Sequence, residues 1–245
     1  MRSSIKFIIF RFILVSLSLC FIFILTEFTL RLIPIKGISM ASSIYDTELK
    51  LYKFTPNSRV IRTNIRNQQI IRNVNSEGFI DLEHSKIKQD GIYRIGFFGD
   101  SYVESIQVPI EKTFFRLIED NLKDKKVESL AFGRSGHGPI HSYLKSKKYT
   151  KYYNIDMVVY VFCENDLGDQ IEEIKQANTL PYVEINEGDL IFNDNLLSKE
   201  IQIRNGLLYT FYNKSIVIQT IYKRLKMLFK YGVKIFANKI CPKVN

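Results

Sequence analysis

Short apolar runs alternate with amphipathic stretches in the middle of the chain. The run Tyr93–Phe98 is largely apolar without alternation, which predicts a strand buried on both faces. Val127–Phe132 and Met157–Phe162 are predicted as a second and a third strand, the third being the most apolar. Thr113–Leu122 and Pro139–Tyr152 have the spacing of helices. Strands that alternate with helices of this length pair in parallel. We therefore expect an α/β domain built on a parallel sheet.

The N-terminal stretch Ile5–Ile33 is strongly apolar, interrupted by Lys6 and Arg11 and then by Glu27 and Arg31, with an uninterrupted core at Phe12–Leu25. With its flanks it is long enough to cross a bilayer. Three basic residues precede the core: Arg2, Lys6 and Arg11. By the positive-inside rule the N-terminus should stay in the cytoplasm and the rest of the chain should lie outside it. We expect an uncleaved signal anchor over residues 1–33; the alternative is a cleaved signal peptide, with Ser39–Ala41 as the nearest cleavage site.

The segments that flank the α/β pattern are less regular. Residues 34–72 are polar and predict an irregular linker, and residues 73–81 are turn-rich around Gly78. We expect residues 34–90 to link the anchor to the domain and wrap it, and residues 91–245 to form the domain. Within the latter, Leu180–Phe192 resembles a hairpin, Gln202–Phe236 is mainly helical, and Gly232–Ala237 could open a fourth strand.

The chain has ten more Lys and Arg than Asp and Glu, and this excess is concentrated after Leu196. Within that region Ser215–Lys230 has apolar residues near one helical face: Ile218, Ile221, Tyr222, Leu225 and Phe229. We favour a helix docked on its own domain over a basic helix lying on an anionic membrane. Nucleic acid is not an expected partner, because the anchor places this region outside the cytoplasm and no nucleic-acid module is visible. The three cysteines form no Cys/His cluster, so we expect no metal site.

Chemistry-bearing residues follow each of the three predicted strands. Gly99-Asp100-Ser101 follows the first, the glycine-rich Gly133–Gly138 the second, and Cys163–Asp166, which contains Asn165, the third. Parallel strands present their carboxyl ends at one edge of the sheet, so these blocks should converge. A serine hydroxyl, a glycine backbone N–H and an asparagine amide together suit acyl chemistry, with a nucleophile and donors for an oxyanion. We expect Gly99 to provide backbone angles that a Cβ would forbid.

These blocks resemble the SGNH (GDSL-type) hydrolase superfamily, in particular its membrane-anchored members. GDSYVES from Gly99, AFGRSGHG from Ala131 and FCENDLGD from Phe162 match its first three blocks, although Ala131 replaces the usual asparagine and Cys163 a usual glycine. The resemblance implies a three-layer α/β/α, flavodoxin-like fold without metal or organic cofactor. It implies hydrolysis or transfer of ester-linked acyl groups, and we expect cell-envelope carbohydrates or lipids to carry these groups. Ser101 would be the nucleophile, and the backbone N–H groups of Ser101 and Gly136 would bind the oxyanion together with the Asn165 side chain.

The family's last block, Asp-x-x-His downstream of the asparagine, is missing, because all three histidines precede Asn165. Three accounts remain open: a chain truncated before that block, a substitute base, or a non-catalytic domain that binds carbohydrate or lipid. Asp81–His84 spells Asp-x-x-His, but we expect an exposed loop there. His137 is better placed at the crevice edge, and His141 should lie on a helix surface. An acyltransferase would use the same residues as an esterase.

Overall fold

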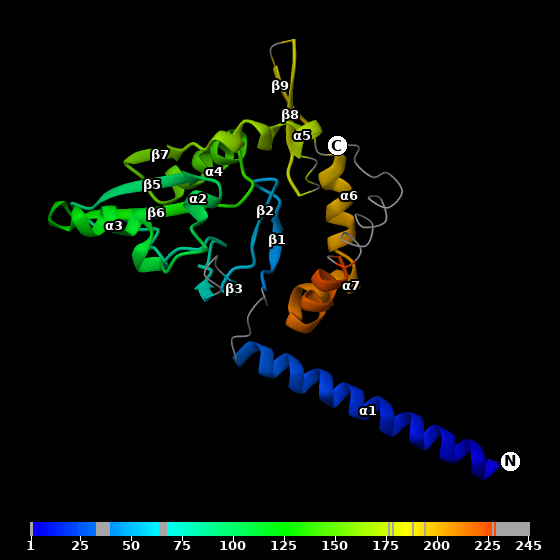
Figure 1. Ribbon diagram of the computed structural model, residues 1–245. Coiled ribbons are helices and arrows are strands. Elements are labelled where there is room, and N and C mark those ends of the chain that lie inside the picture. Colours follow the sequence, from blue (N-terminus) through cyan, green and yellow to red (C-terminus); the bar gives the residue numbers. More distant parts are fainter. Residues whose placement is uncertain are drawn as a thin grey trace, which may run out of the picture.

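The computed structural model describes residues 2–32, 40–63, 68–175, 177, 179–187, 189–193, 195–226 and 228 of the 245. The chain is mixed α/β, with one parallel three-stranded sheet and three antiparallel hairpins among these residues (Figure 1). The main elements are α1 (Arg2–Leu32), β1 (Ser43–Asp46), β2 (Leu51–Phe54), β3 (Arg59–Thr63), β4 (Gln69–Asn73), β5 (Tyr93–Gly99), α2 (Ser101–Glu104), α3 (Phe114–Asn121), β6 (Val127–Gly133), α4 (Pro139–Tyr152), β7 (Met157–Val161), α5 (Glu172–Lys175), β8 (Tyr182–Asn186), β9 (Asp189–Asn193), α6 (Asn195–Arg204) and α7 (Leu207–Lys214). Short 3₁₀ turns η1 (Ile110–Lys112), η2 (Lys123–Lys125), η3 (Glu164–Asp166) and η4 (Gly168–Gln170) connect them, and residues 216–226 form a further helix.

The predicted parallel sheet is confirmed, with strand order β6-β5-β7. Gly99, the last residue of β5, pairs with Gly133 of β6 and Val161 of β7, so all three strands end at one edge. The helices predicted at residues 113–122 and 139–152 correspond to α3 and α4, and the predicted hairpin to β8 and β9. The apolar run predicted as a fourth strand, Gly232–Ala237, lies outside the described residues.

The two faces of β5 and β6 pack against different helices. On one face Phe98 and Phe132 stack with Tyr149 of α4, and their cluster also includes Leu49 and Phe79 from the preceding segment. On the other face Ile95, Phe97 and Ala131 pack against Val103 of α2 and Phe115 of α3. The alternation of buried side chains along β5 thus gives the sheet an apolar contact on both sides, as the unbroken apolar run predicts.

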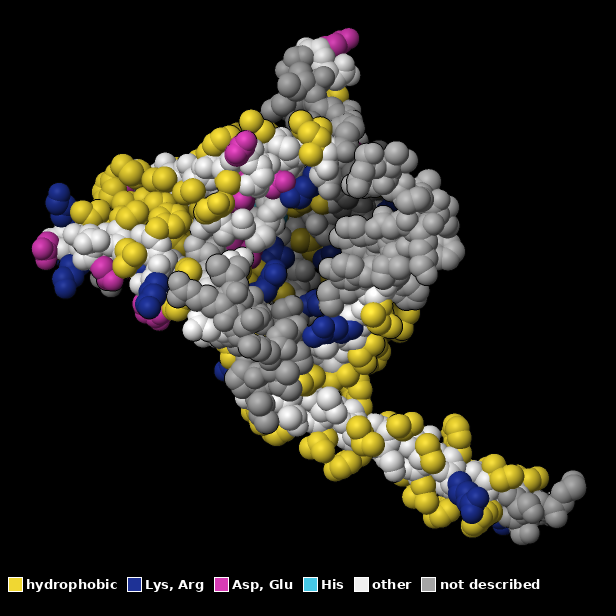
Figure 2. Space-filling view, viewed as in Figure 1, with side chains coloured by type: hydrophobic (Ala, Val, Ile, Leu, Met, Phe, Trp, Pro, Cys, Tyr) yellow, Lys and Arg dark blue, Asp and Glu magenta, His cyan; other side chains and the backbone are white. Residues whose placement is uncertain are grey.

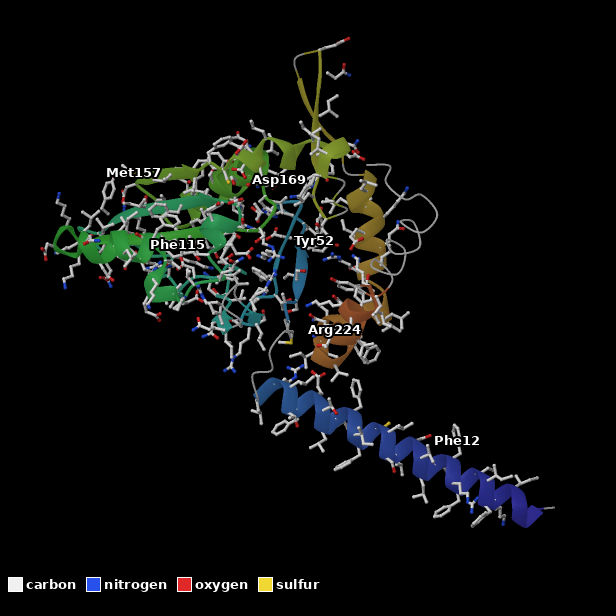
Figure 3. The ribbon with its side chains drawn as sticks, in the orientation of Figure 1. Phe12, Tyr52, Phe115, Met157, Asp169 and Arg224 are labelled. Carbon is white, nitrogen blue, oxygen red and sulfur yellow. The ribbon has the colours of Figure 1, made fainter. Side chains whose placement is uncertain are left out.

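β7 departs from its sequence-based expectation. Although it is the most apolar of the three strands, it is an edge strand that pairs only with β5 among the described residues. Its side chains remain substantially exposed at Met157, Val158 and Tyr160, as does Phe162 just after it. The surface over β7 and β5 is accordingly hydrophobic in Figure 2, and Met157 is labelled on this strand in Figure 3. The apolar sequence correctly predicted a strand, but it does not indicate how many other strands pair with it.

The segment predicted as an irregular linker instead forms two hairpins, β1–β2 and β3–β4. The strands are four or five residues long, too short for a clear period-2 pattern. Their buried residues Phe54 and Val60 form a second small core with Val74 and Ile80. The turn predicted around Gly78 is present, with Gly78 at a φ of +88°.

α1 extends away from the rest of the molecule (Figure 1). From Ile5 to Leu32 it has a mean hydropathy of 2.8 over its most apolar window, none of it buried, so it is long and apolar enough to cross a membrane. An N-terminal signal sequence would have the same properties. The C-terminal end of α1 contacts the residues that follow α7: Glu27 accepts hydrogen bonds from the Ser215 hydroxyl and from the backbone N–H groups of Ile216 and Val217.

The helix over residues 216–226 docks on its own chain, but with a different face from the predicted one. Ile216 and Gln219 are fully buried, Ile216 against Ile61 of β3. Ile221, Tyr222 and Leu225, the predicted buried face, are each about half exposed. Gln219 is buried because its amide accepts from the Ala41 N–H and donates to the Asn213 carbonyl, a polar contact that hydrophobic spacing does not reveal. Phe229 lies outside the described residues.

Candidate functional site

Ser101 lies directly beyond the carboxyl end of β5 and opens α2. The preceding Asp100 is completely buried and caps this helix, its Oδ1 accepting a hydrogen bond from the Tyr102 N–H at 2.9 Å. The Ser101 side chain is exposed. Gly99 does not have the unusual φ expected of it; it is needed because a Cβ there would lie 2.7 Å from Val103 Cγ2 and push α2 away. The strand end therefore presents a solvent-accessible hydroxyl on a closely packed turn.

Asn165 lies in η3, beyond the end of β7, and reaches the same carboxylate as Ser101. Ser101 Oγ and Asn165 Nδ2 each donate to Asp100 Oδ2 at 3.3 Å, so the two side chains are at most twice that distance apart. Asn165 Nδ2 also donates to Asp169 Oδ2 at 3.1 Å. Both of its N–H groups therefore point to carboxylates, and an oxyanion would replace one of these acceptors.

Gly136 lies in the loop after β6, at a φ of +80° that only glycine adopts readily. This loop is attached to α2 by Glu104, whose carboxylate accepts from the Ser135 N–H at 2.6 Å and from its hydroxyl at 2.9 Å. The Arg134 N–H donates to the Gly99 carbonyl at 3.2 Å. The turn that carries Gly136 is thus held against the turn that carries Ser101. The Gly136 N–H donates to no other backbone group in the described part of the chain.

Lys175 connects Gly136 to Asn165. Its Nζ lies 2.5 Å from Asp169 Oδ1, while the other Asp169 oxygen accepts from Asn165. A Cβ on Gly136 would lie 3.3 Å from Lys175 Nζ, so the ammonium sits beside the glycine. Ser101 and Asn165 are therefore joined through Asp100, Asn165 and Lys175 are joined through Asp169, and Gly136 lies beside the Lys175 ammonium. In Figure 3, Asp169 lies near the end of the parallel sheet that faces α6.

The Asp81–His84 pair is not in an exposed loop, contrary to the expectation. His84 lies 2.7 Å from Glu128 and 3.1 Å from Asp81, and its side chain is almost completely buried. Burial lowers the pKa of His84, but the hydrogen bonds to Asp81 and Glu128 outweigh this effect and raise it to about 9. Glu128 is near the start of β6, about 16 Å along the strand from Gly133 at roughly 3.3 Å per residue. His84 therefore serves the opposite end of the sheet from Ser101.

The other two histidines are buried and neutral. His141 is not on a helix surface as expected; it is 1% exposed, with Nδ1 accepting from the Gly138 N–H and Nε2 bonded to the Pro181 carbonyl, each at 3.0 Å. Burial is the main cause that lowers its pKa to about 4. His137 is also buried, and burial together with the nearby positive charges, Lys145 first, holds its pKa well below 6.5. No histidine is hydrogen-bonded to Ser101.

A buried lysine underlies the two strand ends. Lys145 of α4 donates from Nζ to the carbonyls of Phe132 at 2.6 Å and Gly99 at 3.2 Å. Because it is fully buried, its pKa falls to about 7. Lys145 thus holds together the ends of β6 and β5 at the points where the chain departs toward Gly136 and Ser101.

Four polar residues of this network were not singled out from the sequence: Asp100, Glu104, Asp169 and Lys175. Asp100 carried a local signal, since an aspartate before a helix is a typical N-cap. Glu104 and Lys175 interact with residues far along the chain, and no local pattern marks such contacts. The described residues contain no group of His, Cys, Asp and Glu side chains able to hold a metal ion. Comparison with protein-family models gives no match, and comparison with curated proteins gives none either.

Proposed function

We propose that this chain is an SGNH/GDSL-type serine esterase that acts on ester-linked acyl groups of extracytoplasmic substrates, such as acylated carbohydrates or lipids of the cell envelope. The observation that carries this proposal is the contact of Ser101 and Asn165 with one oxygen of Asp100, at the carboxyl edge of a parallel sheet. The strand order β6-β5-β7, or second-first-third in sequence order, agrees with the start of a flavodoxin-like 2-1-3-4-5 sheet. α1 would anchor the domain, with the basic N-terminus in the cytoplasm.

In this proposal Ser101 Oγ attacks the acyl carbon of the ester and forms a tetrahedral oxyanion. The N–H groups of Ser101 and Gly136 and the Asn165 amide stabilise the negative charge. The Ser101 proton passes to Asp100 Oδ2, the carboxylate oxygen to which the hydroxyl donates. Asp100 gives this proton to the leaving alcohol as the acyl-enzyme forms. It then takes a proton from the water that attacks the acyl-enzyme and returns it to Ser101 as the acid leaves. A carboxylate is generally a weaker base than imidazole, so we expect slow turnover.

A non-catalytic carbohydrate- or lipid-binding domain is the second candidate, and the histidines favour it. Each of the three side chains is buried, and among the described residues none is hydrogen-bonded to the Ser101 hydroxyl. His84 and His141 have both ring nitrogens engaged by other groups. A serine without a strong base is a poor nucleophile. Such a domain would keep the strand-end crevice for binding alone.

Hydrolysis of 4-nitrophenyl acetate by the full chain in a non-ionic detergent separates the two candidates. We expect Ser101→Ala to abolish the enzyme-dependent rate. Ser146→Ala, which removes a hydroxyl of α4 that donates to the Tyr143 carbonyl, should leave it unchanged. Equal rates for the wild type and Ser101→Ala would reject the esterase. Product analysis with a sugar acceptor would distinguish transfer from hydrolysis.

A further inference from the structure

A pocket of about 430 Å³ lies beside Gly136. Its wall contains three cationic side chains from separate parts of the chain: Arg134 after β6, Lys175 of α5 and Arg204 of α6. Among the described residues, no Asp or Glu lines it. Figure 2 shows Lys and Arg side chains gathered in the hollow at the centre of the visible face, and Tyr52, another lining residue, is labelled beside this hollow in Figure 3. The pocket is therefore basic, although acidic residues are present nearby.

Arg134 is the cation with the most unused hydrogen-bonding capacity. Its guanidinium stacks 3.5 Å over the Phe54 ring and forms an ion pair with the buried Glu104 at 3.7 Å, which is beyond hydrogen-bond distance. None of its side-chain N–H groups donates a hydrogen bond to another described residue. Arginine presents these groups in a planar fork that matches the oxygens of a carboxylate or phosphate.

The other two cations are held by carboxylates outside the pocket but keep N–H groups available. Lys175 pairs with Asp169, which accounts for one of its three N–H groups. Arg204 Nε pairs with Glu200 at 2.6 Å, while its guanidinium lies over the Tyr52 ring. These pairs fix the direction of the side chains, so an incoming anion would meet preorganised donors.

Two buried polar atoms on the lining residues have no hydrogen-bond partner among the described residues: Tyr52 Oη and His137 Nδ1. Burial, the largest effect, raises the pKa of Tyr52 to about 12, so its hydroxyl remains a donor at neutral pH. The charges that act most strongly on His137 are all positive and include Lys145, Arg134 and Lys175. Buried polar groups without partners are costly, so both residues keep unused hydrogen-bonding capacity next to the pocket.

We propose that this pocket binds the phosphate group of the substrate, with Arg134 as its principal donor and Lys175, Arg204 and Tyr52 completing the site. The inference rests on the proposed function. Gly136, a proposed oxyanion donor, lines the same pocket, so a phosphate bound there would lie next to the ester carbonyl. The preferred substrate is then an acyl ester that carries a phosphate, either a sugar phosphate or a phospholipid headgroup.

Calorimetric titration of the full chain in non-ionic detergent with inorganic phosphate, at constant ionic strength, tests the site. We expect Arg134→Gln to weaken binding by about tenfold or more, the effect of losing charge-assisted hydrogen bonds. Arg59→Gln removes the same charge from an exposed position on β3 and should leave affinity unchanged. Tyr52→Phe loses no internal hydrogen bond, so it should fold normally and bind more weakly. If Arg134→Gln does not fold, the phosphate affinity of Tyr52→Phe decides the test. Unchanged affinity in both pocket variants, or no binding by the wild type, would overturn the proposal.

Two further arms identify the source of the phosphate and separate this inference from the esterase. Glucose 6-phosphate and dihexanoylphosphatidate are titrated in parallel, and the one bound more tightly through Arg134 identifies the sugar or the lipid. Ser101→Ala should bind both like the wild type while losing hydrolysis. With the substrate 4-acetoxyphenyl phosphate, Arg134→Gln should raise KM more than it does with 4-nitrophenyl acetate. Arg134-dependent binding without Ser101-dependent hydrolysis would support the phosphate-binding pocket and reject the esterase.

Discussion

Glu104 and Ser135 are joined by two hydrogen bonds, which the Glu104 carboxylate accepts from the Ser135 backbone N–H at 2.6 Å and from the Ser135 hydroxyl at 2.9 Å. Glu104 ends the short helix that Ser101 begins, and Ser135 immediately precedes Gly136. This buried carboxylate therefore sets the distance between the candidate nucleophile and the candidate oxyanion glycine. It is a positioning residue, acting through the loop that it holds.

Replacing Glu104 should affect both the stability of the fold and the position of the loop that carries Gly136. Glu104→Ala leaves the Ser135 N–H without its acceptor, and we expect a loss of about 1–3 kcal/mol in the free energy of unfolding. Glu104→Gln keeps one acceptor oxygen and should lose less. Urea unfolding of both variants, with the exposed Glu111→Ala as control, measures the effect. If Glu104→Gln keeps most of the wild-type kcat for ester hydrolysis and Glu104→Ala does not, the role of Glu104 is positioning. Equal kcat values for Glu104→Ala and the wild type would contradict this role.

Gly133 allows α2 to lie directly on the end of β6, because a Cβ there would overlap the backbone of Glu104. We expect Gly133→Ala to destabilise the fold by about 1–3 kcal/mol or more, the usual cost of overpacking, and to displace Ser101. Gly168→Ala is the matched control, since its Cβ would make only an ordinary 3.4 Å contact with Ile174. Thermal unfolding followed by circular dichroism gives the comparison. Similar melting temperatures for the two variants would show that α2 does not pack as described.

The buried cluster around His84 should make stability depend on pH. Its folded pKa of about 9 exceeds the ordinary value of 6.5, so the folded state binds the proton more tightly. The resulting stabilisation, up to about 3 kcal/mol, is complete below pH 6.5 and is lost as the pH rises through 9. His84→Gln should remove this component from urea-unfolding curves measured between pH 6.5 and 9. A variant whose stability depends on pH in the same way as that of the wild type would exclude His84 as a contributor.

Lys145 should act in the opposite direction. Its folded pKa of about 7 lies below the ordinary 10.5, so between these values the unfolded state binds more protons and stability rises with pH. The two effects oppose each other, and the wild-type profile between pH 7 and 9 should be flatter than that of His84→Gln. In Lys145→Met the rising component should vanish, which leaves a steeper decline than in the wild type. An unaltered slope would mean that Lys145 is charged in the folded protein.

The parallel sheet could be predicted from the sequence because each strand and helix carries its own local pattern. The convergence of Ser101 and Asn165 follows from the same reasoning, since parallel strands end at one edge. What the pattern could not provide is the set of neighbours around each element. β7 is apolar enough for the interior, yet Val158 is about half exposed because nothing in the described chain pairs with its outer edge.

Contacts between distant polar residues account for most other differences. His84 appeared to belong to an exposed loop, but Glu128, far along the chain, draws it into a buried ion pair. The helix over residues 216–226 buries Gln219 in preference to Leu225, because Ala41 and Asn213 supply partners for the amide. Such contacts have no periodicity along the sequence, so they become visible only in the fold.

Covalent labelling of Ser101 tests the central claim most directly. A fluorophosphonate reacts with a serine that is activated as a nucleophile, and intact mass spectrometry of the full chain in non-ionic detergent measures the adduct. We expect one adduct on the wild type, none on Ser101→Ala, and undiminished labelling of Ser146→Ala. An unlabelled wild type, or equal labelling of the wild type and Ser101→Ala, would contradict the assignment of Ser101 as the nucleophile.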